Sequence, residues 1–106
     1  MKKVKITVLS TNLCSEYAGK YGADGCGKCT LFEEGQEFYT GNSKPENFCA
    51  QAWMDIHHYI FALTHGGGME TFFNGSWVKQ PGVAIACCTD GIRPVTFKIE
   101  ATDEVI

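Results

Sequence analysis

The sequence contains no long apolar run and no cluster of basic residues. No window approaches the roughly 18 apolar residues that a membrane-spanning helix needs, so we expect no membrane partner. The chain has 9 Lys and Arg against 12 Asp and Glu, spread along it, and a formal net charge of −3. Because a basic patch is missing, we expect no nucleic-acid partner. Repeats and low-complexity tracts are also absent, so residues 1–106 are predicted to form a single domain.

The amino-terminal segment lacks the pattern of a secretory signal. "MKKVKITVLST" has the lysines of one, but Lys5 and Thr7 interrupt its apolar stretch, and this alternation is typical of a strand. We therefore expect a cytoplasmic protein. In that reducing compartment the 6 cysteines are expected to stay free, bind metal or carry out redox chemistry, whereas a secreted chain would favour three disulfides.

Period-two alternation and turn residues predict an α+β fold. Residues 3–9, "KVKITVL", place Val4, Ile6 and Val8 on one face of a half-buried strand. Further strands are predicted at residues 36–40, 83–88 and 93–101. We therefore expect a small, mainly antiparallel sheet of about four strands, packed on one long apolar helix.

The long helix is predicted between the second and third strands. Ser43 is in a position to cap it, and Pro45 and Glu46 suit its first turn. Residues 48–63 are mostly apolar, which predicts a helix buried over most of its circumference. The three glycines at 66–68 end it.

The last two strands are predicted to form a hairpin. Asp90-Gly91 signals a tight turn, since glycine adopts positive φ without steric cost. Residues 83–88 are apolar on both faces, which predicts a strand in the centre of the sheet. Asp90 and Arg93 flank the turn and are predicted to stabilise it, with recognition of a small anion as the alternative.

Residues 10–30 are rich in glycine and cysteine and have no clean period, so they are predicted to be mainly loop, with a short helix around "LCSEYAGKY". Cys26 and Cys29 form a Cys-x-x-Cys motif, a spacing that lets two sulfurs bind one metal. A thioredoxin-like site needs a strand before this motif, and the preceding "KYGADG" is not one. Haem attachment needs a histidine where Thr30 stands.

The other cysteines supply the remaining ligands of a predicted metal site. Cys49 lies on the core-facing side of the long helix, and Cys87 and Cys88 point to opposite faces at the end of a strand. Zinc or an iron–sulfur cluster suits four thiolates. The predicted ligands are therefore Cys26, Cys29, Cys49, and one or both of Cys87 and Cys88.

Two other functions fit the same residues. In the first, the protein is a thiol-redox or sulfur-carrier protein in which one cysteine is reactive. In the second, it is a cofactor-free interaction or small-ligand module whose cysteines only pack, since free cysteine behaves as a small apolar side chain. Cys14 is interpreted as structural in all cases. The sequence determines neither a substrate nor whether the protein is an enzyme.

The remaining polar and aromatic candidates are weaker. Asp55 and His58 share one stripe of the helix, where an ion pair is expected to be structural. His57 points about 100° away from His58, and His65 suits the helix carboxyl terminus. The segment 66–81 is predicted to be irregular, with aromatic side chains for a pocket or a homo-oligomer interface: Phe72, Phe73 and Trp77.

Four segments together carry a resemblance: "MKKVKITVL", "CTLFEEGQEF", "FCAQAWMDI" and "CCTDGIRPVTFKIE". They resemble a family of short, uncharacterised prokaryotic proteins, many from anaerobes, that end in a Cys-Cys-Thr-Asp-Gly segment. The similar stretches cover about half of the chain. The family implies no mechanism, but the resemblance separates the cysteines into two groups. Cys29, Cys49, Cys87 and Cys88 fall within the matching segments, whereas Cys14 and Cys26 fall outside, which favours a site built from the first set.

Overall fold

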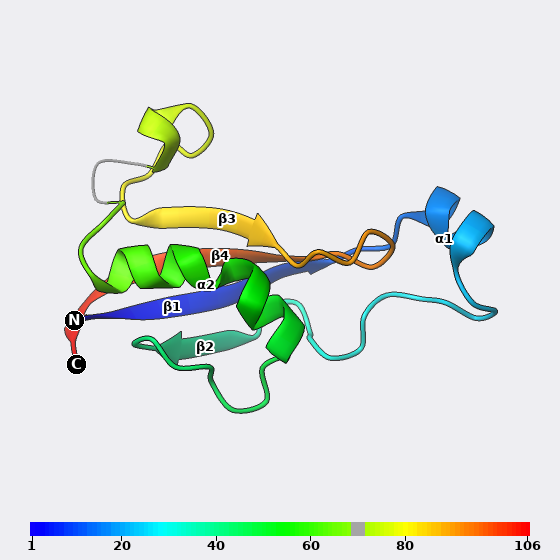
Figure 1. The fold of residues 1–106 in the computed structure, drawn as a ribbon, viewed down its shortest axis with the longest axis horizontal. Coiled ribbons are helices and arrows are strands. Elements are labelled where there is room, and N and C mark those ends of the chain that lie inside the picture. The colour runs from blue at the N-terminus through cyan, green and yellow to red at the C-terminus, as the bar shows by residue number, and fades with distance from the viewer. Residues whose placement is uncertain (69–71) are drawn as a thin grey trace.

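The secondary structure is known from a computed structural model that describes residues 1–68 and 72–106, with the backbone alone at 73 and 74. Its elements are β1 (Lys2–Thr11), α1 (Ser15–Tyr21), β2 (Glu37–Thr40), α2 (Ala50–Thr64), the 3-10 helix η1 (Phe72–Gly75), β3 (Val83–Cys87) and β4 (Val95–Val105). The four strands form one antiparallel sheet in the order β2-β1-β4-β3 (Figure 1). The predicted α+β class and four-stranded antiparallel sheet are confirmed.

The core lies between one face of the sheet and α2, which crosses that face (Figure 1). Alternation decides which strand residues face it: Val4, Ile6 and Val8 of β1 are buried, as predicted. Their partners in the core come from β4 and from α2: Val95, Phe97, Ile99, Ala52, Ile56, Ile60 and Leu63. Burying each large aliphatic or aromatic side chain contributes about 1.5–3 kcal/mol, so this cluster fixes how α2 sits on the sheet.

The predicted start of the long helix is wrong. α2 begins at Ala50 with Cys49 as its N-cap, not at Ser43. The reason is local: Asn47 has a φ of 61°, a left-handed conformation that an α-helix cannot continue through. The carbonyl of Ser43 instead accepts the hydroxyl of Thr40, which ties it into the turn after β2. The end is close to the prediction, with α2 stopping at Thr64.

The prediction of one long helix that is apolar nearly all round also differs from the structure. α2 buries one side only, whereas the short helix predicted around residues 13–21 is confirmed as α1. Met54 and Phe61 are exposed by 71% and 50%, although both are apolar. The apolar residues of α2 therefore do not all lie in the core, contrary to what the sequence pattern predicted.

The prediction that residues 83–88 form a central strand is wrong. β3 lies at the edge of the sheet and pairs only with β4 among the described strands. Its second apolar face is accessible at Ile85 and Cys87 but buried at Val83. On the first face, Ala84 is buried and Ala86 packs on the core. The long strand β4 takes the central place instead, because it also pairs with β1 along most of its length.

The connection from β3 to β4 spans residues 88–94 and is longer than the predicted tight turn. Gly91 does not adopt the positive φ expected of it. The carboxylate of Asp90 shapes this loop instead, since its Oδ1 accepts the backbone N–H groups of Ile92 at 2.9 Å and Arg93 at 2.8 Å. The expected stabilising role of Asp90 is confirmed through these bonds.

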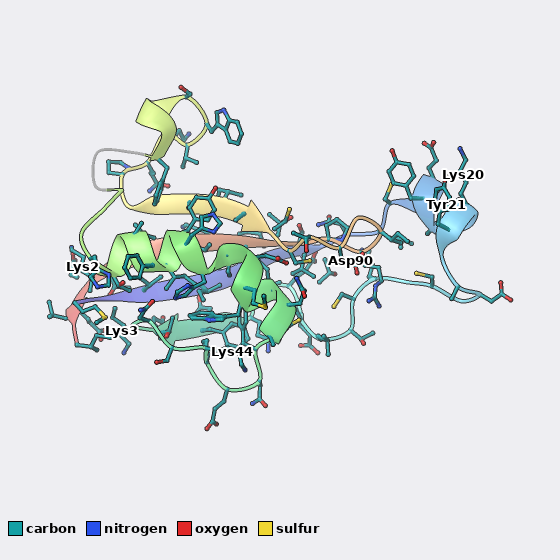
Figure 2. The ribbon with its side chains drawn as sticks, in the orientation of Figure 1. Lys2, Lys3, Lys20, Tyr21, Lys44 and Asp90 are labelled. Atoms are coloured by element: carbon teal, nitrogen blue, oxygen red, sulfur yellow. The ribbon has the colours of Figure 1, made fainter. Side chains whose placement is uncertain are left out.

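The segment between β1 and β2 extends beyond the sheet (Figure 1). α1 buries no residue, but the chain before it is fixed, because the backbone N–H of Cys14 donates to the carbonyl of Ile92 at 2.8 Å. Figure 2 shows Asp90 between the sheet and α1, which carries Lys20 and Tyr21. None of the described helices is both long and apolar enough to cross a membrane.

Candidate functional site

Three of the cysteines meet at a small pocket near the amino-terminal end of α2. The pocket has a volume of about 180 Å³. Cys29, Cys49 and Cys88 line it, and they come from the segment before β2, the start of α2 and the residue after β3. The other lining residues are Leu31, Phe32, Gln51, Ala52, Asp90, Arg93 and Val95. We refer to it below as the thiol pocket.

Cys49 occupies the N-cap position of α2. Its backbone is extended, with φ −61° and ψ 125°, and its carbonyl accepts the N–H of Trp53 at 3.0 Å. Its side chain makes no capping hydrogen bond, and the residue lines the pocket. Because the amino-terminal end of a helix carries partial positive charge, this side of the pocket favours an anion.

Cys88 is placed by the alternation of β3. Ala84 and Ala86 face the core, and Cys88 continues that face one residue beyond the strand. Its N–H donates to the carbonyl of Val95 at 3.2 Å, and its Sγ accepts the N–H of Val95 at 3.4 Å. Cys87 is exposed and does not line the pocket, so the structure brings only one of the adjacent pair to the site.

Cys29 is held at the pocket by the packing of Phe32, which lies three residues further along the chain. Phe32 is buried, and its ring centroid lies 5.0 Å from that of Phe48 and 5.2 Å from that of Phe97. Edge-on aromatic contacts of this kind add to the free energy of burial. They hold a segment that has no helix or strand of its own against the core, and Cys29 packs beside them.

Cys26 and Cys14 lie elsewhere. Cys26 lines a separate, open depression beside α1 with Leu13 and Ala18. The Cys-x-x-Cys motif is thus split, with Cys29 in the thiol pocket and Cys26 outside its lining. Cys14 is the N-cap residue of α1.

Arg93 and Asp90 form the charged wall of the pocket. The Nε–H of Arg93 donates to Oδ2 of Asp90 at 3.2 Å. Backbone hydrogen bonds from Arg93 and Ile92 lower the pKa of Asp90 below its ordinary value, and the guanidinium adds to this. The hydrogen bond and charge of Asp90 raise the pKa of Arg93.

The polar stripe of α2 supports the site in a way that the sequence did not predict. Asp55 Oδ2 accepts the backbone N–H and the hydroxyl of Thr89, and Asp55 Oδ1 accepts the side chain of Gln51 at 3.2 Å. Asp55 thus bonds to the loop after Cys88, not to His58 as expected. None of the histidines lines the pocket: His57 contacts Asn42 at 2.8 Å, and His65 contacts the Phe61 carbonyl at 2.9 Å.

Residues 77–80, at the end of the segment predicted to be irregular, line a larger pocket of about 610 Å³ beside β3. Trp77, Tyr59 and Lys98 are among the residues that line it. The ring of Phe72 packs edge-on against Tyr59, with centroids 5.4 Å apart. Residues 69–71 and the side chain of Phe73 lie outside the described part of the chain, so the expectation for them stays a prediction. A homo-oligomer interface on this segment likewise stays a prediction.

The cysteines are free thiols, and the described residues do not form a metal site. All six cysteines are unpaired. Within residues 1–68 and 72–106, no group of three or more Cys, His, Asp or Glu side chains is close enough to hold a metal ion. Three thiols around one small pocket can nevertheless exchange with a disulfide ligand, and a second thiol can then attack the mixed disulfide that forms.

Comparison with protein-family models, with curated proteins and with solved structures finds no match to this chain. The resemblance described above therefore stays a prediction, and functional conclusions depend on the geometry of the pocket. Sequence reasoning did not place Gln51 or Arg93 at the thiols. A signal for Arg93 was present, because it follows Cys88 by only five positions in a loop that must turn back.

Proposed function

We propose that the thiol pocket carries out dithiol–disulfide exchange on a small sulfur compound. The observation that supports this is that Cys29, Cys49 and Cys88, which are far apart in the sequence, line one pocket of about 180 Å³. Each is only partly buried, so a ligand can reach the sulfur. The protein is then a small thiol-redox protein of the cytoplasm, where dithiols are kept reduced.

The exchange proceeds by two displacements. A pocket thiolate attacks one sulfur of a substrate disulfide, forms a mixed disulfide and releases the first substrate thiolate, which takes up a proton. A second pocket thiol, after losing its proton, attacks the protein sulfur of the mixed disulfide and releases the second substrate thiolate. The substrate disulfide gains two electrons, and the pocket dithiol becomes a protein disulfide. A cellular thiol reductant restores the dithiol by the reverse exchange.

Disulfide mapping tests this proposal. The reduced protein is treated with a small disulfide, alkylated, digested and analysed by mass spectrometry. We expect a protein disulfide between two of Cys29, Cys49 and Cys88, and its loss when both members of that pair are replaced by serine. Cys87→Ser is the matched control, because Cys87 adjoins Cys88 but is exposed on the other face of the sheet. Modification confined to Cys87 and Cys14 contradicts the proposal.

A metal or cluster site is the second candidate, because three sulfurs line one pocket and thiolates suit zinc and iron–sulfur clusters. It requires a fourth ligand, from Cys26 or Cys87, to move into the pocket. Elemental analysis of protein purified without oxygen tests it. Stoichiometric zinc or iron, lost in Cys49→Ala, favours this candidate over exchange. Its absence, together with slow alkylation of all pocket thiols in the folded protein, favours purely structural cysteines.

A further inference from the structure

Arg93 gives the thiol pocket a charged recognition group. Of the described residues that line the pocket, Arg93 alone is basic and Asp90 alone is acidic. The side chain of Arg93 is 45% exposed, so a ligand can reach it from solvent.

The guanidinium is held at one nitrogen and available at the others. Its Nε–H donates to Asp90, whose other oxygen is occupied by two backbone N–H groups of the same loop. In the described part of the structure, the bond to Asp90 is the only side-chain hydrogen bond of Arg93, and the two terminal nitrogens form none. A guanidinium matches the two oxygens of a carboxylate with parallel hydrogen bonds, and fixing Nε reduces the freedom that binding must remove.

The size of the pocket limits the ligand. At about 30 Å³ for each water molecule, a volume of about 180 Å³ corresponds to roughly six water-sized groups. That is the size of one half of a small disulfide with a short carbon chain and one polar end group. Leu31, Phe32 and Val95 supply apolar walls for such a chain.

We propose that the substrate of the thiol pocket is a small organic disulfide that carries a carboxylate, which binds Arg93 while its sulfur lies against the pocket thiols. This inference rests on the proposed exchange function and adds the substrate class. The chemical step is the double displacement described above. Arg93 makes no bond to the reacting sulfur and is a specificity-determining residue.

The test compares three small disulfides of different charge: dithiodipropionate, bis(2-hydroxyethyl) disulfide and cystamine, which are anionic, neutral and cationic. Second-order rate constants for oxidation of the protein are divided by those for a free model thiol in the same buffer, which removes differences in intrinsic reactivity. We expect the anionic disulfide to exceed the neutral one by a factor on the order of ten, the range of a charge-assisted hydrogen bond. Cystamine is expected to be the slowest.

Two charge-removing variants separate recognition by Arg93 from general electrostatic attraction. Arg93→Gln is expected to lose the preference for the anionic disulfide. Lys28→Gln, which removes an exposed charge next to Cys29 but outside the pocket lining, is expected to keep it. Arg93→Lys is expected to keep part of it, because lysine retains the charge without the paired donors.

The outcomes distinguish the two proposals. Equal corrected rates for all three disulfides, measured on the unaltered protein, refute the assignment of Arg93 and leave thiol exchange intact. An equal loss of preference in Lys28→Gln and Arg93→Gln also refutes it, because attraction is then not specific to the pocket. If no disulfide oxidises the pocket thiols, both the function and the substrate class are wrong.

Discussion

Asp55 of α2 accepts two hydrogen bonds from Thr89, one from the backbone nitrogen at 2.8 Å and one from the hydroxyl at 3.1 Å. Thr89 is the residue after Cys88, so these bonds join the second turn of α2 to the loop that carries a pocket thiol. Asp55 does not line the pocket. We interpret it as a positioning residue, which fixes Cys88 relative to Cys49 at the start of the same helix.

Removing this link is expected to loosen the loop without unfolding the protein. Asp55→Ala should lower the free energy of unfolding by about 1 kcal/mol, since both bonds are near solvent. In the same variant, alkylation of Cys88 should become faster relative to Cys87. Urea unfolding and mass-spectrometric thiol mapping measure the two effects. Glu46→Ala, which removes an exposed acid outside the helix, is the control and should change neither.

A double-mutant cycle tests whether the two residues act together. Thr89→Val removes the hydroxyl bond but keeps the backbone bond. The effects of Asp55→Ala and Thr89→Val should therefore be non-additive, with a coupling free energy of roughly 0.5–1 kcal/mol. Additive effects would show that the contact contributes nothing to stability.

The pKa of Asp90 gives stability a defined pH dependence. Two backbone N–H groups and then Arg93 favour its ionised form, so its pKa is lower in the folded than in the unfolded protein. The carboxylate therefore stabilises the fold at pH values above its unfolded pKa of about 3.9, and this stabilisation is lost as the pH falls through the lower folded value.

Asp90→Ala should accordingly be less stable than the unaltered protein at pH 7, by about 1 kcal/mol, and the difference should shrink below about pH 4. Urea unfolding over a series from neutral to acid pH measures it. Asp90→Asn should lose less, since an amide oxygen can still accept backbone N–H groups in a turn. A difference that stays constant down to pH 2.5 contradicts the assigned role.

The sequence was informative where one physical rule decides the outcome. Val4, Ile6 and Val8 alternate with polar residues, and burial on one side of a sheet leaves no other arrangement. It failed for β3, because Ile85 is apolar yet faces outward, and no local pattern distinguishes an exposed apolar edge from a buried centre. The placement of Arg93 and Cys29 in the lining of one pocket could not be predicted either, because it depends on how a long loop packs against another element.

Phe32 is expected to hold Cys29 in the pocket. Phe32→Ala removes a buried ring that contacts three other phenylalanines, Phe38, Phe48 and Phe97, and should lower the free energy of unfolding by roughly 3–5 kcal/mol. Phe32→Leu, which fills more of the space, should lose less and allow the folded state to be studied. In that variant, alkylation of Cys29 should become faster while that of Cys87 is unchanged. Met54→Ala is the control, because Met54 is 71% exposed, lies outside the pocket lining and should affect neither stability nor Cys29 much.

The adjacent cysteines are expected to differ sharply in reactivity and in structural role. Cys87 is exposed on the outer face of β3, whereas Cys88 is partly buried and its sulfur accepts the N–H of Val95. A bulky maleimide should therefore label Cys87 well before Cys88 in the folded protein and both equally in urea, as mass spectrometry after digestion will show. Cys87→Ser should leave stability within about 0.5 kcal/mol of the unaltered protein. Cys88→Val should cost more, because the N–H of Val95 loses an acceptor and the pocket loses its shape. Faster labelling of Cys88 than of Cys87 by the bulky reagent contradicts the difference in exposure assigned to the two residues.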